Sequence, residues 1–177
     1  MKRVVLIGSE STGKTTLARR LAEHYDVEWV PEFVRDYAER KGDALVFDDH
    51  APIARGQIAL EDEYRVRATE RDAPLLLQDT DLLSTAVYCA HYYGKCPFWL
   101  TEAAKARRPD LYLLLDIDLP WIADSARDRG HMRDEMQLLF RQAVEQSGVP
   151  FVVVSGDADA RFAGARTAID ELLQLSS

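Results

Sequence analysis

Short apolar runs alternate along the chain with segments of helical periodicity. The runs predict five strands, at Arg3–Ile7, Val27–Val30, Leu75–Asp79, Leu111–Asp116 and Phe151–Ser155. Most of them are continuously apolar, as expected for parallel strands that helices cover on both faces. The pattern therefore predicts a three-layer α/β/α domain around a five-stranded parallel sheet, with residues 1–177 as one domain.

Two helical stretches, residues 31–40 and about 50–71, separate the second and third expected strands. One face of the second stretch carries Ile53, Gln57, Leu60 and Tyr64. These helices would lie beside the first loop, where a second substrate would bind. After the fourth strand, an Arg-rich segment at about 124–133 leads into four apolar residues at helical spacing, Met136, Leu139, Phe140 and Val144. This segment is predicted to be a lid over phosphates, anchored on a core-packed helix.

The first loop has the sequence Gly8-Ser9-Glu10-Ser11-Thr12-Gly13-Lys14-Thr15 and leads through Thr16 into a helix. This is the spacing of a P-loop, in which backbone N–H groups and the positive end of the helix surround phosphates. Lys14 would reach the β- and γ-phosphate oxygens, and the Thr15 hydroxyl would bind Mg²⁺. The alternative is a chance glycine-rich turn, which the strand-loop-helix context disfavours. The loop, from Gly8 to Thr16, predicts ATP or GTP binding.

Charge and cysteine content narrow the class of protein. The net charge is −8, and basic residues are scattered or lie near the P-loop and the Arg-rich segment, which argues against a nucleic-acid surface. Cys89 and Cys96 match neither a CxxC pair nor a metal knuckle, so both are interpreted as structural. Without a signal peptide or a membrane-spanning apolar run, the expected location is the cytoplasm.

Three carboxylates follow expected strands. Asp79 ends the third strand and is placed like the Walker-B acid that holds Mg²⁺, although capping of the next helix is an alternative. For Asp81 the two roles are about equally supported. Glu32 follows the second strand and Pro31, close to a helix start, where a glutamate can act in the chemistry or simply complement the helix dipole.

The Arg-rich segment supplies Arg127, Arg129 and Arg133. An arginine offers a permanently charged donor fork to the oxygens of a phosphoryl group in transfer, so one or two of these should be catalytic. Pairing with Asp124, Asp128 and Asp134 in a solvated loop is the alternative. The histidines, His131 included, form neither a zinc motif nor a hydrolase triad.

Several segments together resemble a known family. The segments that carry the resemblance, in order along the chain, are GSESTGKTTL, VPEFVRDY, IARGQ, LQDTDLLST and YLLLDIDLPWIAD. With this order and spacing, the chain from Val4 to about Arg161 looks like the ribosylnicotinamide kinase domain of the bacterial NadR type. The resemblance implies a P-loop fold related to nucleoside and nucleotide kinases. It also implies transfer of the ATP γ-phosphate to the 5′-hydroxyl of nicotinamide riboside, which gives nicotinamide mononucleotide. Multifunctional NadR proteins carry further domains before the kinase, and this sequence begins at the kinase strand. It is therefore expected neither to repress transcription nor to make NAD itself.

The resemblance also implies residue roles. Glu32 would accept or orient the 5′-hydroxyl proton, and Arg35 and Asp81 would lie near the ribose or the incoming phosphate. Arg127 would pack on ATP, and Arg133 would follow the transferred phosphate. Candidates for a wall around the nicotinamide ring are Trp29, Phe33, Gln57 and Tyr64, although core packing is the alternative for Trp29 and Phe33.

Two other functions stay open at this stage. A nucleotide-switch ATPase acting on a protein partner is one, although the Asn-Lys-x-Asp guanine signature is absent from the sequence. A P-loop kinase of another small hydroxyl substrate, such as a deoxynucleoside or a coenzyme precursor, is the other, because only the acceptor pocket would differ.

Overall fold

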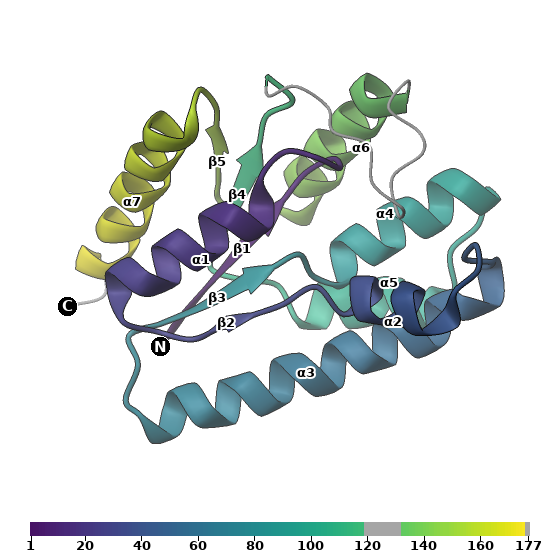
Figure 1. The fold of residues 1–177 in the computed structure, drawn as a ribbon, viewed down its shortest axis with the longest axis horizontal. Helices are drawn as coiled ribbons and strands as arrows, with labels where there is room; N and C mark the ends of the chain where they lie inside the picture. Colours follow the sequence, from purple (N-terminus) through teal and green to yellow (C-terminus); the bar gives the residue numbers. More distant parts are fainter. Residues whose placement is uncertain (119–131, 176–177) are drawn as a thin grey trace.

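The computed structural model describes residues 1–118 and 132–175. Five strands form one parallel sheet with the order β2-β3-β1-β4-β5 (Figure 1). The strands are β1 (Lys2–Ile7), β2 (Trp29–Val30), β3 (Leu75–Asp79), β4 (Leu111–Leu115) and β5 (Phe151–Val154). The first strand thus lies in the middle, and the loop that follows it opens at the carboxyl ends of its neighbours β3 and β4. Ligands bind at this edge in open parallel sheets, where the strand order reverses.

Helices cover both faces of the sheet. They are α1 (Lys14–Tyr25), α2 (Phe33–Lys41), α3 (His50–Glu70), α4 (Leu82–Tyr93), α5 (Phe98–Ala106), α6 (Arg133–Ser147) and α7 (Ala158–Gln174), with a short 3₁₀ turn η1 (Phe47–Asp49) before α3. Helices α1 and α7 pack on one face, and α3, α4 and α6 pack on the other. The predicted three-layer architecture is therefore confirmed.

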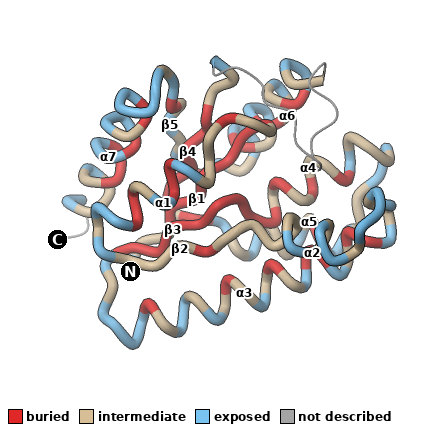
Figure 2. Tube along the Cα trace, in the orientation of Figure 1, coloured by how far each residue is buried: buried red, intermediate tan, exposed pale blue. Residues whose placement is uncertain are grey.

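Alternate residues of the central strand face the two helix layers. Val4 and Leu6 pack under α1 and α7, whereas Val5 and Ile7 pack under α4 and α6. All four are inaccessible to solvent, and Figure 2 shows the buried strands as the centre of the molecule. Burial of both faces explains why the strands appear in the sequence as continuous apolar runs.

Small differences from the sequence prediction occur at element ends. The predicted second strand, 27–30, is a strand only at Trp29–Val30, because this edge strand pairs with β3 over just two residues. The helix predicted to start at Pro31 begins at Phe33, with Glu32 as its extended N-cap residue. The predicted helix after the lid segment is confirmed as α6, with Met136, Phe140 and Val144 buried.

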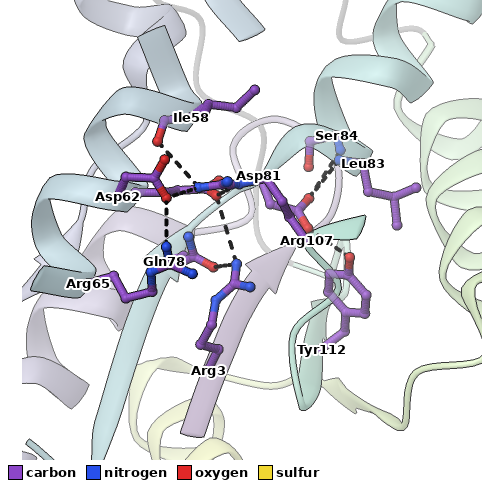
Figure 3. A network of polar contacts seen from close by, with 11 residues as sticks. Arg3, Ile58, Asp62, Arg65, Gln78, Asp81, Leu83, Ser84, Arg107 and Tyr112 are labelled. Carbon is purple, nitrogen blue, oxygen red and sulfur yellow. Dashed lines mark hydrogen bonds and ion pairs between the residues drawn. The ribbon is translucent and has the colours of Figure 1, made fainter. Parts of the chain in front are cut away.

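A network of polar and charged side chains joins α3, the end of α5 and the sheet on the face opposite α1 (Figure 3). Its centre is Glu61, which is only 3% exposed. Glu61 accepts a hydrogen bond of 3.0 Å from Arg107 Nε and lies 3.8 Å from Arg3 Nη2. Arg107 also pairs with Asp62, and Arg3 donates to Gln78 Oε1 over 3.0 Å. We call these five residues the Glu61 network.

No helix among the described residues is long and apolar enough to cross a bilayer.

Candidate functional site

The loop after β1 has a backbone that forms a cradle. Gly8 has φ +141°, and a Cβ atom there would lie 2.8 Å from the carbonyl oxygen of Leu115, so glycine is required on two grounds. Gly13 and Ser11 also have positive φ angles, of 82° and 55°. The Thr12 hydroxyl donates to the Ser9 carbonyl over 2.9 Å and closes the turn. The loop predicted as a P-loop therefore has a strained, internally bonded backbone, which is typical of a binding loop.

Lys14 places a positive charge over this cradle. Its ammonium donates to the carbonyl oxygens of Gly8 and Ser9, over 3.0 and 2.7 Å. The helix α1 begins at this residue, and its first turn has no acidic side chain. The helix N-terminus and the ammonium therefore act together on the same small volume, as in an anion-binding site.

Asp79 and Thr15 form the next part of the site. The Thr15 hydroxyl donates to Asp79 Oδ2 over 2.5 Å. Asp79 is 1% exposed, and its other oxygen, Oδ1, is buried without a hydrogen-bond partner in the described part of the chain. A buried carboxylate oxygen without a partner is costly, and a hydroxyl beside a carboxylate is a donor set that Mg²⁺ accepts.

These two residues therefore fit a Mg²⁺ ion held jointly with nucleotide phosphates and water. A cage made of protein side chains alone is not present, because residues 1–118 and 132–175 contain no group of three or more metal-binding side chains. Mg²⁺ ordinarily binds through one or two carboxylates plus substrate phosphates, so this is the expected arrangement.

Thr80 separates the two carboxylates that follow β3. This β-branched residue has φ +70°, which is a strained conformation for a side chain of its shape. Its N–H donates to the Leu6 carbonyl over 3.0 Å and holds the turn against β1. The strained turn directs Asp79 and Asp81 to different surroundings.

Asp81 is the N-cap residue of α4. One of its carboxylate oxygens accepts from the N–H groups of Leu83 and Ser84, and the other accepts from the Tyr112 hydroxyl over 2.7 Å. Burial raises the pKa of Asp81, and the hydrogen bond from Tyr112 opposes that rise. Of the two roles that the sequence left open, the helix cap is the one these hydrogen bonds form, and both oxygens are engaged in it.

The start of α2 is fixed to α3. The Phe33 N–H donates to Gln57 Oε1 over 2.9 Å. The Phe33 ring lies against Gly56, where a Cβ atom would approach the ring to 2.1 Å. Glu32, directly before the helix, lies 3.8 Å from Arg35 in an ion pair. Gln57, a candidate for the nicotinamide wall, therefore braces the residue next to Glu32.

The four residues proposed as an aromatic and polar wall do not form one group, because only Phe33 and Gln57 contact each other. Trp29 packs into the cluster under α1 and α7. Tyr64 packs into the cluster between α3 and the outer strands, with Arg67 over its ring at 4.0 Å. Trp29 and Tyr64 thus lie on opposite faces of the sheet, since Tyr64 packs in the cluster of Val30, the strand neighbour of Trp29 that points to the other side. Core packing, the alternative considered for Trp29, describes its surroundings.

Two aromatic side chains that sequence reasoning missed lie beside the P-loop. Tyr88 and Tyr92 of α4 stack with their ring centroids 5.8 Å apart and an angle of 22° between the rings. They line a surface hollow together with Ser9, Glu10, Met132, Arg133 and Met136. Their four-residue spacing on a helix was the available signal, because it places both rings on one face.

Arg133 starts α6 and reaches the P-loop, where its Nη2 donates to the Ser11 carbonyl over 3.2 Å. Burial, together with the charge of nearby Arg161, lowers the pKa of its guanidinium. Arg127, Arg129 and the rest of the predicted lid, up to His131, lie outside the described residues. Arg161, which sequence reasoning did not identify, also contacts the P-loop, at the Thr12 carbonyl.

Comparisons with known proteins agree with this geometry. Residues 3–161 match the AAA domain family. Two curated relatives are named "Trifunctional NAD biosynthesis/regulator protein NadR": the Escherichia coli (strain K12) protein is 32% identical over 92% of this chain, and the Salmonella typhimurium (strain LT2) protein is 30% identical over 98%. The chain spans only 40% and 43% of their lengths.

Solved structures give the same result. A NadR protein in complex with NR superposes with a TM-score of 0.76 at 27% identity, over 96% of this chain and 49% of that chain. A NadR protein in complex with NAD and AMP-PNP superposes with a TM-score of 0.70 at 29% identity, over the same shares. The P-loop fold and the resemblance to NadR, both predicted from sequence, are confirmed.

Proposed function

The chain belongs to the AAA domain family, and we propose that it is an ATP-dependent kinase that phosphorylates the 5′-hydroxyl of nicotinamide riboside. The observation that carries the nucleotide half of the proposal is the group formed by Lys14, Thr15 and Asp79 at the P-loop. The acceptor half is supported by the similarity to a NadR structure that contains NR, over 96% of this chain. The product would be nicotinamide mononucleotide, an intermediate in NAD biosynthesis.

In this proposal Lys14 leaves its two loop carbonyls to bind the β- and γ-phosphates. Thr15 and Asp79 would hold Mg²⁺, which supplies neutralisation of the phosphate charge. P-loop residues from Gly8 to Thr16 would bind the phosphates, largely through backbone N–H groups. Arg133, already at the loop, would follow the transferred phosphoryl group, and Arg127 would pack on ATP.

Glu32 is the proposed proton acceptor. The acceptor oxygen forms its bond to the γ-phosphorus while the bond from that phosphorus to the β–γ bridging oxygen breaks, and the hydroxyl proton passes to the Glu32 carboxylate as ADP leaves. The brace formed by Gly56 and Gln57 would keep Glu32 in place. Arg35, paired with Glu32, would orient it or contact the ribose.

For the ring of the acceptor, we propose Tyr88 and Tyr92 as a wall in addition to the earlier candidates. A pyridinium ring is a planar cation, and the faces of tyrosine rings attract cations. Glu10, in the same hollow, would add a negative charge. Substrate binding stays a proposal for Trp29, Gln57, Tyr64 and Asp81. In the structure Trp29 and Tyr64 pack in the core, Gln57 braces Phe33, and Asp81 caps α4.

The chain is proposed to act as one kinase domain with its lid at about residues 124–133, in the cytoplasm. The two free cysteines suit a reducing compartment. ATP and a small acceptor are the proposed partners, with no role for nucleic acid or a membrane.

A product assay tests the function. Purified protein with Mg²⁺ and ATP is offered nicotinamide riboside, a panel of deoxynucleosides, or no acceptor, and the products are identified by mass spectrometry. We expect nicotinamide mononucleotide and ADP in equal amounts, with the Lys14→Ala variant as background. Phosphorylation of a deoxynucleoside alone would support the second kinase function. ADP release without any phosphorylated acceptor would support the nucleotide-switch ATPase.

A further inference from the structure

Arg161 is a buried cation that joins three loops at the nucleotide end of the sheet. Arg161 lies in the first turn of α7, and its side chain is only 3% exposed. Its Nη1 donates to the Thr12 carbonyl of the P-loop over 2.9 Å. Its Nε donates to the Gly156 carbonyl over 2.8 Å, and its Nη2 donates to the Asp116 carbonyl over 3.0 Å. The Asp118 carboxylate pairs with the same Nη2.

These acceptors come from different parts of the fold. Thr12 precedes α1, Asp116 and Asp118 follow β4, and Gly156 lies between β5 and α7. Asp118 also accepts from the Gly156 N–H over 2.5 Å, so the second and third loops are tied to each other as well. We call Arg161, Asp118 and their three carbonyl partners the Arg161 clamp.

We propose that Arg161 is a positioning residue that holds the P-loop in its nucleotide-binding shape without touching the nucleotide. Thr12 lies in the turn between the positive-φ residues Ser11 and Gly13. A loop in a strained conformation persists only where surrounding contacts determine it. Arg161 supplies such a contact, because it binds the carbonyl of the peptide group between Thr12 and Gly13. Holding this carbonyl also orients the Gly13 N–H, which belongs to the same peptide group.

The charge of the clamp supports this role. Burial alone would raise the pKa of Asp118, but the hydrogen bond from Gly156 and the charge of Arg161 hold that pKa below its ordinary value. Arg161 therefore keeps a charged partner across the pH range of the cell. A permanently charged guanidinium with a fixed donor fork suits three acceptors in different directions.

A lysine at this position would keep the charge and lose the fork. One ammonium cannot reach the carbonyls of Thr12, Gly156 and Asp116 from the positions of Nη1, Nε and Nη2 at once. At least one buried carbonyl would lose its partner, which is unfavourable. If the lost partner belongs to the P-loop, the cost appears in nucleotide binding.

The test compares Arg161→Lys and Arg161→Met with Arg166→Lys and Arg166→Met. Arg166 lies on the same helix, is exposed, and pairs only loosely with Asp170, at 3.9 Å. Calorimetry measures the dissociation constant of a non-hydrolysable ATP analogue with Mg²⁺, and kinetics gives KM for ATP and for nicotinamide riboside separately. Hydrogen exchange of free protein reports on the amides of residues 9–14.

We expect Arg161→Lys to raise the analogue dissociation constant by about tenfold, which corresponds to one carbonyl contact. The KM for nicotinamide riboside should stay within about threefold, and exchange should rise in residues 9–14. Both Arg166 variants should match wild type. Arg161→Met should have a larger effect in the same direction.

Three results would overturn the inference. The first is an Arg161→Lys protein that binds the analogue as wild type does. The second is an Arg161→Lys protein whose KM values for ATP and for nicotinamide riboside rise equally. The third is failure of both Arg161 variants to fold. The second or the third result would make Arg161 a general structural residue. The inference rests on the proposed nucleotide site, and wild-type protein separates the two: if wild type does not bind the analogue, the proposed function fails first.

Discussion

The Arg161 clamp and the Glu61 network both use buried charge to join distant parts of the chain, yet they join different kinds of atoms. Arg161 binds mainly backbone carbonyls of loops around the P-loop. The Glu61 network joins mainly side chains to side chains, between α3, the end of α5 and the sheet (Figure 3). One sets loop conformation at the edge where nucleotide would bind, and the other fastens a helix layer to the sheet.

Burial and charge do not by themselves identify a functional site. Arg161 and Glu61 are equally buried, at 3% exposed, but Glu61 has the stronger sign of an active residue, because burial raises its pKa against the opposing effect of Arg107. Perturbed carboxylates of this kind occur in structural networks as well as in active sites. What distinguishes the Arg161 clamp is its connection to a strained loop. We therefore expect the two regions to separate function from stability.

The largest effect on function is expected at Lys14. Lys14→Ala removes the charge that would reach the β- and γ-phosphates, so turnover should fall by two or more orders of magnitude. The midpoint of thermal unfolding should shift by less than about 3 °C, because the side chain is only half-buried and serves a ligand site. Steady-state kinetics and calorimetric unfolding on the same preparation measure both. An active Lys14→Ala enzyme would contradict the phosphate-cradle assignment.

The P-loop could be predicted because its chemistry lies in eight consecutive residues. Local backbone geometry, which sequence spacing encodes directly, requires glycine at Gly8 and Gly13. The same spacing places Lys14 and Thr15 at the start of the helix. The position of Asp79 beside the P-loop could also be predicted, because a carboxylate at the end of a buried strand has few possible surroundings. The five strands followed from apolar runs, and the structure changes only their ends: β1 gains Lys2, whereas β2, β4 and β5 are shorter than predicted.

The rest of the site could not be predicted, because it depends on which side chains meet across the fold. Arg161 is about 150 residues from Thr12 in sequence, and no local pattern marks their contact. Trp29 and Tyr64 looked like partners, but Trp29 packs under α1 and α7, whereas α3 carries Tyr64 on the opposite face of the sheet. For Asp81, spacing could not say whether a cap or a ligand would take its oxygens.

The second prediction concerns the Glu61 network and stability. Arg107→Met leaves the buried Glu61 carboxylate with Arg3 alone, at 3.8 Å, and should lower the free energy of unfolding by about 3 kcal/mol. The analogue dissociation constant of the folded protein should stay within about twofold of wild type. Urea unfolding and calorimetry at a temperature where the variant is folded measure these two quantities.

A double variant supplies the control. Arg107→Met with Glu61→Leu removes both charges, so it should recover much of the lost stability. If Arg107→Met instead weakens nucleotide binding as strongly as Arg161→Lys, the division between the two regions is wrong.

The third prediction concerns α3, which carries both Glu61 of the network and the Gly56–Gln57 brace. Gly56→Ala places a Cβ atom 2.1 Å from the Phe33 ring, so the ring and the start of α2 must move. We expect a loss of about 2 kcal/mol of stability and a fall in turnover of about tenfold, with nucleotide affinity unchanged. Adding Phe33→Ala should relieve the clash. Kinetics on Gly56→Ala, on Phe33→Ala and on the double variant measure the coupling, and simple additivity would argue against the brace.

The smallest effect is a pH dependence at Glu61. Burial raises the pKa of Glu61 in the folded state, so the folded protein holds this proton more readily than the unfolded chain does. The protonated side chain therefore contributes to stability below the unfolded pKa of about 4.3. This contribution is lost as pH rises through the folded pKa. Glu61→Gln has no proton to lose. The stability of Glu61→Gln relative to wild type should therefore increase as pH rises from about 4 toward neutrality, and be level above that window. Urea unfolding of both proteins across this range measures the difference, in which the other carboxylates cancel. A difference that falls with rising pH would mean that the arginines outweigh burial and that the Glu61 carboxylate is stabilised by the network.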